Sequence, residues 1–422
     1  MTHHAERPAL AAVVADDLSG AAEVAGLLLQ RDRPCTVLLG VPASPRRDHE
    51  VTAAGTLVVD VGHRGAAPAA AHAAVTGAVA ALAPGGVLAV KLDSLWRGNV
   101  GATVVALRDS GFGVVLAGAL PALDRTVVGG VPLVGGVALA HTDLWHREPG
   151  PAPARVADLL PAGTPSRGLD LAAVRSPDLL PRLRAALATG ACAVVDAETG
   201  ADLAAVAAAA AALAAEGARV ALAGSAALVA ALADTTPAPG GAPVPAAPAG
   251  GVRPTAVVVG SGSRAAAGQT THLLATAPDA ALVLVDPDPH PRADPDPGTT
   301  ADGLPPDAAD PLVLSLGGVH PDSADAVARL ADRAVACVQG RDLVLTGGET
   351  AHAVLTRLGV TALRPLAQLS HGAVVSLTED GRLVATKPGS FGGDSELHDL
   401  VLLLRRLRAP ATMAGREPQE DL

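Results

Sequence analysis

Residues 9–20, Ala-Leu-Ala-Ala-Val-Val-Ala-Asp-Asp-Leu-Ser-Gly, decide the fold: an apolar run is followed by two adjacent carboxylates and a glycine-containing turn. Residues 9–14 predict a buried strand, and the residues after Asp17 predict a helix. In an open α/β sheet, ligands bind at the carboxyl ends of strands, so Asp16 and Asp17 could hold hydroxyls, hold a metal or accept a proton. The alternative is that Asp17 or Ser19 only caps the helix.

Further short runs rich in Val and Leu alternate with Ala-rich helical stretches, a pattern typical of a parallel α/β sheet. The expected strands are residues 9–14, 35–39, 56–61, 86–92, 113–117 and 191–195, then 255–259, 281–285, 312–316, 342–345, 374–377 and about 382–385. The predicted fold class is therefore α/β, with two domains that each contain a mostly parallel sheet flanked by helices.

The domain limits follow from composition. A chain of 422 residues is long enough for two cores. Residues 235–254 are rich in Pro, Ala and Gly and predict a linker between domains at 1–234 and 255–408. We expect residues 286–311 to form an exposed loop and 409–422 a disordered tail.

Composition excludes several classes of partner. A net charge of −11, two Phe, two Trp and no Tyr argue against nucleic-acid binding. The Ala-rich run at 203–215 is too short to span a membrane. Three widely separated cysteines have neither disulfide nor zinc spacing, so we expect a cytoplasmic protein. No motif selects a set of metal ligands, and the oligomeric state is left open between a monomer and a homodimer.

A polar segment follows the expected strand 86–92. It contains Lys91, Asp93, Ser94, Arg97 and Asn99. A polyhydroxy acid requires donors for its carboxylate and both donors and acceptors for its hydroxyls, which this mixture supplies. The alternative is a solvated connection with Arg97 in a surface ion pair. Arg64 follows another expected strand and would lie at the same sheet edge.

Two glycine-rich stretches in the second half predict phosphate binding. One is Gly347-Gly348-Glu349-Thr350 at the start of a helix, and the other runs from Thr386 through Lys387 and Gly389 to Gly393. Glycines let backbone amides approach phosphate oxygens, and a helix N-terminus adds favourable potential. Together with Lys387, these loops suit a nucleoside triphosphate. The alternative is ordinary turns and a helix cap.

Residues 260–265, Gly-Ser-Gly-Ser-Arg-Ala, fit the dinucleotide pattern G-x-G-x-x-A after a strand. This makes an NAD(P)-dependent oxidoreductase a rival interpretation. Ser261 and Ser263 give the turn hydroxyls that could equally hold phosphate.

In order and spacing, four of these segments resemble the four-carbon acid sugar kinase family, the ATP-dependent threonate, erythronate and 3-oxo-tetronate kinases. The matching segments are residues 15–20, 91–99, 124–130 and 347–350, and the resemblance extends over about residues 9–405. It implies an N-terminal domain for the sugar acid, a C-terminal domain for ATP and Mg²⁺, and an active site in the cleft between them. By the resemblance, ATP is held by Ser261 or Ser263 and by Gly347, Gly348, Glu349, Thr350 and Gly389, and the sugar acid by Asp16, Asp17, Arg64, Lys91, Asp93, Arg97 and Asn99. From the polar segments themselves we add Lys387 and both serines to the predicted ATP site, and Ser94 to the predicted sugar-acid site.

Our hypothesis for the mechanism is that a terminal hydroxyl of the sugar acid attacks the γ-phosphorus of ATP. Asp17, or else Asp16 or Asp93, accepts the proton, while Lys91, Arg97 and Arg64 bind the carboxylate. Residues 60–64, Asp-Val-Gly-His-Arg, depart from the family's Asp-Thr-Glu-Ser-Arg, and Leu95 replaces a Thr. These departures predict altered specificity and leave open a catalytically degenerate binding protein.

Overall fold

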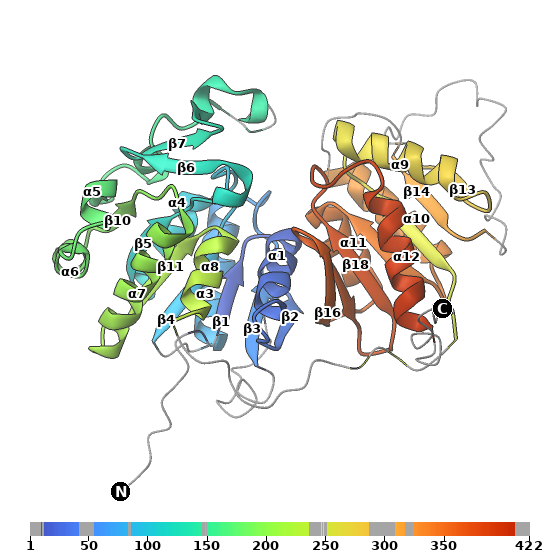
Figure 1. Cartoon of the computed structure of the whole chain (residues 1–422), viewed down its shortest axis with the longest axis horizontal. Coiled ribbons are helices and arrows are strands. Elements are labelled where there is room, and N and C mark those ends of the chain that lie inside the picture. The colour runs from blue at the N-terminus through green and yellow to red at the C-terminus, as the bar shows by residue number, and fades with distance from the viewer. Residues whose placement is uncertain are drawn as a thin grey trace, which may run out of the picture. The chain divides into compact units, whose positions relative to one another are not determined.

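The computed structural model describes residues 10–409 apart from 11, 42–54, 83–85, 146–147, 149, 236–245, 247, 249–250, 287–308 and 317–323. The chain divides into two compact units (Figure 1). One comprises Met1–Pro243 with Thr361–Pro365, and the other comprises Val244–Val360 with Leu366–Leu422. Most of the predicted linker 235–254 and of the predicted loop 286–311, and the predicted tail beyond residue 409, lie outside the described residues.

The first unit is built on a parallel sheet in the order β2-β3-β1-β4-β11-β5-β10-β9. Its strands are β1 (Ala12–Ala15), β2 (Cys35–Leu39), β3 (Thr56–Asp60), β4 (Val87–Lys91), β5 (Gly113–Ala117), β9 (Ser166–Leu169), β10 (Cys192–Val195) and β11 (Val220–Gly224). Ala362 and Leu363, at the start of β16 (Ala362–Ser370), pair antiparallel with β2 and extend this edge.

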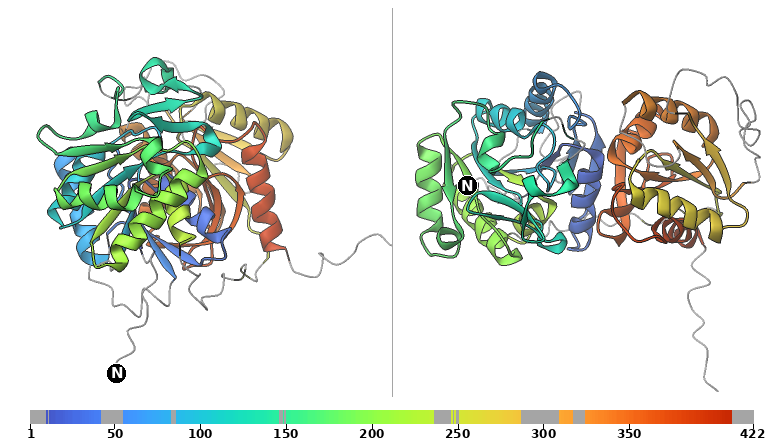
Figure 2. Two further views of the ribbon diagram at one scale, coloured as in Figure 1. Left: turned by 60° about the vertical axis from the view of Figure 1, so that its left-hand side comes forward. Right: turned by 90° about the horizontal axis from the view of Figure 1, so that it is seen from above.

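Helices cover both faces of this sheet (Figure 2). α3 (Pro68–Leu82) and α4 (Val100–Asp109) pack together on one face, where alternate strand residues such as Val14, Val59 and Val90 are buried against them. α1 (Leu18–Leu29), α8 (Ala226–Ala233), α7 (Gly200–Ala215) and α6 (Leu179–Ala188) form a second packed row. This burial on both faces explains why the strands are continuously apolar.

A small antiparallel sheet adds to the first unit. It consists of β6 (Arg125–Val128), β7 (Val131–Val134) and β8 (Val137–Ala138). Short helical turns surround it at Pro121–Leu123, Leu139–His141, Asp143–Trp145 and Val156–Leu159, and α5 (Leu171–Val174) follows β9. The sequence analysis did not predict this sheet, whose strands are short and interrupted by glycines.

The second unit contains the strands β13-β14-β12-β15-β18-β17, of which all but β17 run parallel. They are β12 (Thr255–Val259), β13 (Ala281–Leu284), β14 (Leu312–Ser315), β15 (Asp342–Thr346), β17 (Ala373–Leu377) and β18 (Leu383–Lys387). α9 (Arg264–Thr276) packs with α12 (Glu396–Arg408), and α10 (Ala324–Cys337) packs with α11 (Gly348–Arg357). The predicted fold class, α/β with mostly parallel sheets, is confirmed.

Candidate active site

Three neighbouring strands of the first unit end together. Ala15 at the end of β1 pairs with Asp60 of β3 and with Lys91 of β4. The segments that follow these strands therefore start at one edge of the sheet, where parallel α/β proteins bind ligands. They carry a charged cluster, which consists of Asp16, Asp17, Glu23, Arg64, Lys91, Asp93 and Arg97.

Asp17 both caps a helix and belongs to the charged cluster. It is the N-cap of α1, and its Oδ1 accepts a hydrogen bond from the Gly20 amide at 2.7 Å. Its Oδ2 accepts from Nη1 of Arg64 at 2.6 Å. Asp17 can therefore cap the helix through one carboxylate oxygen and belong to the charged cluster through the other.

Arg64 holds the acidic pair together. Its Nε and Nη2 each donate to the Asp16 carboxylate at 3.0 Å, a two-point contact that fixes the guanidinium plane. Gly98, with φ of +81°, lies against Arg64, and a Cβ there would approach Arg64 Cγ to 2.8 Å. A glycine after Arg97 is therefore required for Arg64 to occupy this position.

Asp93 forms the second strong pair. Arg97 donates to it through Nε at 2.7 Å and Nη2 at 2.9 Å, and the Leu95 and Arg97 amides add further bonds. Burial opposes ionisation of Asp93, but Arg97, followed by Arg64, holds its pKa well below the usual range. Asp93 is therefore an ionised anchor for its loop.

Asp17 has the opposite electrostatics. Burial raises its pKa to about 6, against the lowering effect of Arg64, and the neighbouring Asp16 contributes to the rise. A carboxylate that titrates near the operating pH is suited to proton transfer, so Asp17 fits a general base better than Asp93 does.

Glu23 belongs to the charged cluster, although the sequence analysis did not single it out. Lys91 is buried, and its Nζ lies 3.1 Å from Glu23 Oε2. Burial opposes the charge, but Glu23 and then Asp16 raise the pKa of Lys91. The available signal was that Glu23 is the sole charged residue of an otherwise apolar helix α1.

Asn99 and Ser94 contact protein groups at this edge. Nδ2 of Asn99 donates to the carbonyls of His63 and Ala66, both at 2.8 Å, and more weakly to that of Arg64. Asn99 thus fixes the loop that carries Arg64. The Ser94 hydroxyl accepts from Nη1 of Arg125. The ligand roles predicted for the first-unit residues stay predictions.

The second unit brings its predicted residues to a comparable edge. Val259 of β12, Thr346 of β15 and Lys387 of β18 pair in one row across three parallel strands. The glycine-containing segments 260–263, 347–350 and 388–393 start at this row. Residues that separate motifs predicted to bind phosphate therefore lie at the same edge of the sheet.

Ser263 connects two of these segments. It is the N-cap of α9, accepting from the Ala266 amide at 3.1 Å, and its hydroxyl donates to the Gly389 carbonyl at 2.7 Å. A Cβ on Gly389 would collide with the Ser261 side chain. Residues 260–265, which fit the dinucleotide pattern, are therefore held against the segment that follows β18.

Gln269, another residue that the sequence analysis missed, supports that segment. It is fully buried, and its Nε2 donates to the carbonyls of Phe391, Gly392 and Gly393 at 3.0–3.2 Å. No sequence pattern marked it, because a glutamine inside a helix is common.

Helix α11 starts beside the same row. Gly347, its N-cap, has φ of +95°, and Gly348, Glu349 and Thr350 form its first turn. The Gly347 amide donates to the Lys387 carbonyl at 3.0 Å, and the Thr350 side chain lies against Gly260. The helix N-terminus adds positive potential at this edge.

Lys387 is 1% exposed at the end of β18. Its Nζ donates to the Pro388 carbonyl at 2.8 Å and more weakly to Thr346 Oγ1 at 3.4 Å. Among the described residues no carboxylate lies within 4 Å of it, and burial lowers its pKa to about 8. A bound anion would stabilise its charged form.

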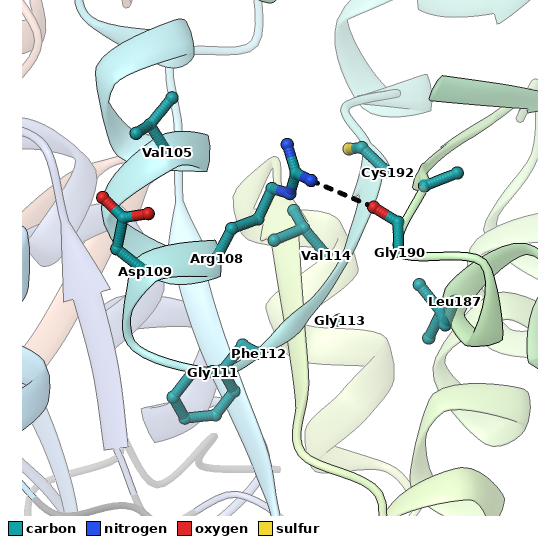
Figure 3. A pocket seen from close by; sticks show the side chains of 11 residues that line it. Val105, Arg108, Asp109, Gly111, Phe112, Gly113, Val114, Leu187, Gly190 and Cys192 are labelled. Carbon is teal, nitrogen blue, oxygen red and sulfur yellow. Dashed lines mark hydrogen bonds between the residues drawn. The ribbon is translucent and has the colours of Figure 1, made fainter. Parts of the chain in front are cut away.

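A cavity of about 440 Å³ lies elsewhere in the first unit (Figure 3). It is lined by Arg108, Phe112 and Cys192 among others, at the amino ends of β5 and β10. Arg108 donates there to the Gly190 carbonyl. None of the predicted site residues lines this cavity.

Metal and membrane features were searched over the described part of the chain. There, no group of three or more His, Cys, Asp or Glu side chains could hold a metal ion. Mg²⁺ bound with a nucleotide does not require such a group, because phosphates and waters supply most of its ligands. None of the described helices is both long and apolar enough to cross a membrane.

Comparison with known proteins identifies the family. Residues 11–232 match a sugar-binding N-terminal domain, and residues 315–397 match a nucleotide-binding C-terminal domain. A D-threonate kinase of Cupriavidus necator is 34% identical over 94% of this chain and 99% of its own length. The chain belongs to the four-carbon acid sugar kinase family. A D-threonate kinase of Salmonella typhimurium is 33% identical to this sugar-acid kinase over 31% of each chain.

Solved structures support the fold of this four-carbon acid sugar kinase. A Haemophilus influenzae protein superposes with a TM-score of 0.68 over 93% of this chain and all of the other, at 21% identity. At this level of identity the likeness supports the fold alone. The family favours the kinase interpretation over the oxidoreductase suggested by residues 260–265.

Proposed function

We propose that this chain is an ATP-dependent kinase that phosphorylates a hydroxyl of a tetronate, with D-threonate as the first substrate to test. The observation that carries the proposal is the similarity to a D-threonate kinase over nearly the full length of both chains. The two groups of residues at strand ends support it, since the first unit offers buried carboxylates and the second a buried lysine among glycine-containing segments.

The first unit binds the sugar acid and removes its proton. The substrate hydroxyl donates to Asp17, whose raised pKa makes it the acceptor of choice, while Asp16 and Asp93 accept bonds from other hydroxyls. The hydroxyl oxygen attacks the γ-phosphorus, the bond to the β,γ-bridging oxygen breaks, and the proton passes to Asp17. ADP leaves with the electron pair of the broken bond.

The second unit binds ATP. Backbone amides of 347–350 and the first turn of α11 approach the phosphates, and Lys387 offsets their charge. Ser261, Ser263 and Gly389 shape the facing segment. Mg²⁺, when bound with ATP, supplies further charge neutralisation on the phosphates.

The test is a coupled assay of ADP release with sugar acids of three to six carbons. We expect ATP turnover that depends on a tetronate, D-threonate first. Absence of turnover with every acid, in a protein that still binds ATP, would contradict the kinase and favour a degenerate binding protein. A change in NAD(P)H absorbance on adding a hydroxy acid would instead support the oxidoreductase.

A further inference from the structure

Trp96 lies in the segment that carries the Asp93–Arg97 ion pair, and its backbone has a conformation that tryptophan rarely adopts. Its φ is +65°, in the left-handed region, where the Cβ is crowded by the backbone. The other non-glycine residues with positive φ in the described part of the chain are Asp32 and Asp124, and aspartate tolerates this region. A bulky residue keeps such a conformation only where its surroundings hold it there, and such positions cluster at functional sites.

The indole ring of Trp96 is held by the ends of two neighbouring strands. Trp96 is 2% exposed and belongs to the apolar core of the first unit. Its ring lies against Gly118, directly after β5, so closely that a Cβ on this glycine would come within 2.3 Å of Cζ2. The carbonyl of the next residue, Ala119, accepts from the Ser225 hydroxyl at 2.5 Å, which ties this segment to the end of β11. The ring therefore rests on a fixed support.

The turn that Trp96 closes holds the Asp93–Arg97 pair. The Trp96 amide donates to the Asp93 carbonyl at 2.8 Å. The amides on either side of it, those of Leu95 and Arg97, both donate to Asp93 Oδ2 at 3.2 Å. The chain turns at this left-handed residue, and the Arg97 side chain reaches back to the same carboxylate. A displacement of the ring would therefore shift Asp93, the acid proposed above to accept a hydrogen bond from a substrate hydroxyl.

We propose that Trp96 is a positioning residue: its ring, seated on Gly118, fixes the orientation in which Asp93 and Arg97 meet the sugar acid. The inference rests on the proposed function and deepens it, because it makes the affinity for the sugar acid depend on a buried ring that acts through its neighbours. A misplacement of about 1 Å in a site can cost about 100-fold, so loss of this contact should be measurable.

The test is calorimetric titration of the full-length protein with D-threonate and, separately, with ATP. Trp96→Gly permits the same backbone conformation but removes the ring. It should weaken D-threonate binding about 10- to 100-fold and change ATP affinity less than about twofold. Trp96→Phe keeps part of the aromatic contact and should lose less affinity than Trp96→Gly.

A second set of variants tests the same contact from the other side. Gly118→Ala keeps the indole but places a methyl group where the ring lies, and should weaken D-threonate binding about tenfold. Combining Gly118→Ala with Trp96→Phe should recover most of that affinity, because the shorter ring leaves room for the methyl group. The matched control is Phe112→Leu, which removes a buried ring of the same core directly before β5, at the opposite end of that strand (Figure 3). It should lower stability to urea and change neither affinity.

Wild-type affinity for D-threonate in Trp96→Gly would overturn the assignment. An equal loss of affinity in Phe112→Leu would do the same, as would a double variant that binds no better than Gly118→Ala alone. Failure of the proposed function has a different signature. A wild type that binds D-threonate without releasing ADP contradicts the kinase, whereas the same titrations still decide the role of Trp96. A wild type that binds none of the sugar acids overturns both.

Discussion

Lys91 and Lys387 are the only two lysines in the 422-residue sequence, and each is the last residue of a strand at the candidate site of its own unit. Both are buried. Lys91 has Glu23 at 3.1 Å, and its pKa is raised, whereas burial lowers the pKa of Lys387 to about 8. The two environments thus shift the pKa of a buried lysine in opposite directions.

The difference shows how each unit handles charge. The first unit balances the charge of Lys91 with the carboxylate of Glu23. In the second unit the effect of Glu396 only partly opposes the effect of burial on Lys387, and under the proposed function this lysine and nearby backbone amides hold the ATP phosphates. A lysine suits both places because its ammonium is compact and its pKa responds to burial, unlike that of an arginine.

The largest expected effect concerns the division of chemistry between the units. Asp17→Asn should lower kcat about 10²- to 10⁴-fold, the usual contribution of a general base, and change ATP affinity less than about twofold. Asp109→Asn, which alters an exposed acid paired with His72, is the control and should retain full activity. Steady-state kinetics with ATP titration checks both, and an unchanged rate would remove Asp17 from the mechanism.

Replacing each lysine by methionine tests the comparison directly. Lys91→Met removes the cation that lies 3.1 Å from the buried Glu23 carboxylate and should lower the free energy of unfolding by about 3–5 kcal/mol. Lys387→Met removes a charge that burial disfavours, so stability should be unchanged or higher, while the Kd for ATP should rise about 10- to 100-fold.

Urea denaturation and ATP titration measure these effects. The control is Lys91→Met combined with Glu23→Leu, which should recover most of the lost stability because both members of this ion pair are then absent. Equal destabilisation by the two single substitutions would contradict the inference that only Lys91 is stabilised by a carboxylate partner.

The two units should also differ in how ligand turnover and ligand binding depend on pH. Below about pH 6, kcat/KM for the sugar acid should fall up to tenfold per pH unit as Asp17 takes up a proton. Above about pH 8, ATP affinity should fall as free Lys387 loses its proton, and Lys387→Arg should abolish that loss. A flat acid limb would contradict the role of Asp17, and an alkaline limb that persists in Lys387→Arg would contradict that of Lys387.

A smaller effect should come from the segment after β18. Gly389→Ala places a methyl group against Ser261 and should raise KM for ATP several-fold. Gly393→Ala is the matched control, because a Cβ there meets nothing within 4 Å. Kinetics at saturating sugar acid distinguishes them, and identical KM values would show that close approach at Gly389 is irrelevant to ATP binding.

Much of the fold could be predicted from the sequence, because buried parallel strands appear in it as continuous apolar runs. The prediction over 374–377 grouped β17 with the parallel strands, but β17 pairs antiparallel with β18. Only five residues connect them, too few for a crossover. β16 also escaped prediction, since its nine residues include a proline and several polar side chains.

The sequence predicted correctly that Asp16, Asp17, Lys91 and Lys387 lie at or directly after strand ends, whereas their roles stay predictions. Sequence could not show which acid neutralises which cation, since Glu23 reaches Lys91 from a helix and Asp196 reaches Gly129 across 67 residues. Pairings of this kind depend on tertiary packing, which no local pattern records.

Phosphorus NMR of ATP incubated with the protein and D-threonate tests the central claim most directly. We predict equal amounts of ADP and a new phosphomonoester with the wild type, and neither with Asp17→Asn or without the sugar acid. Release of ADP with inorganic phosphate in place of the phosphomonoester, or formation of the phosphomonoester by Asp17→Asn at the wild-type rate, would contradict the account.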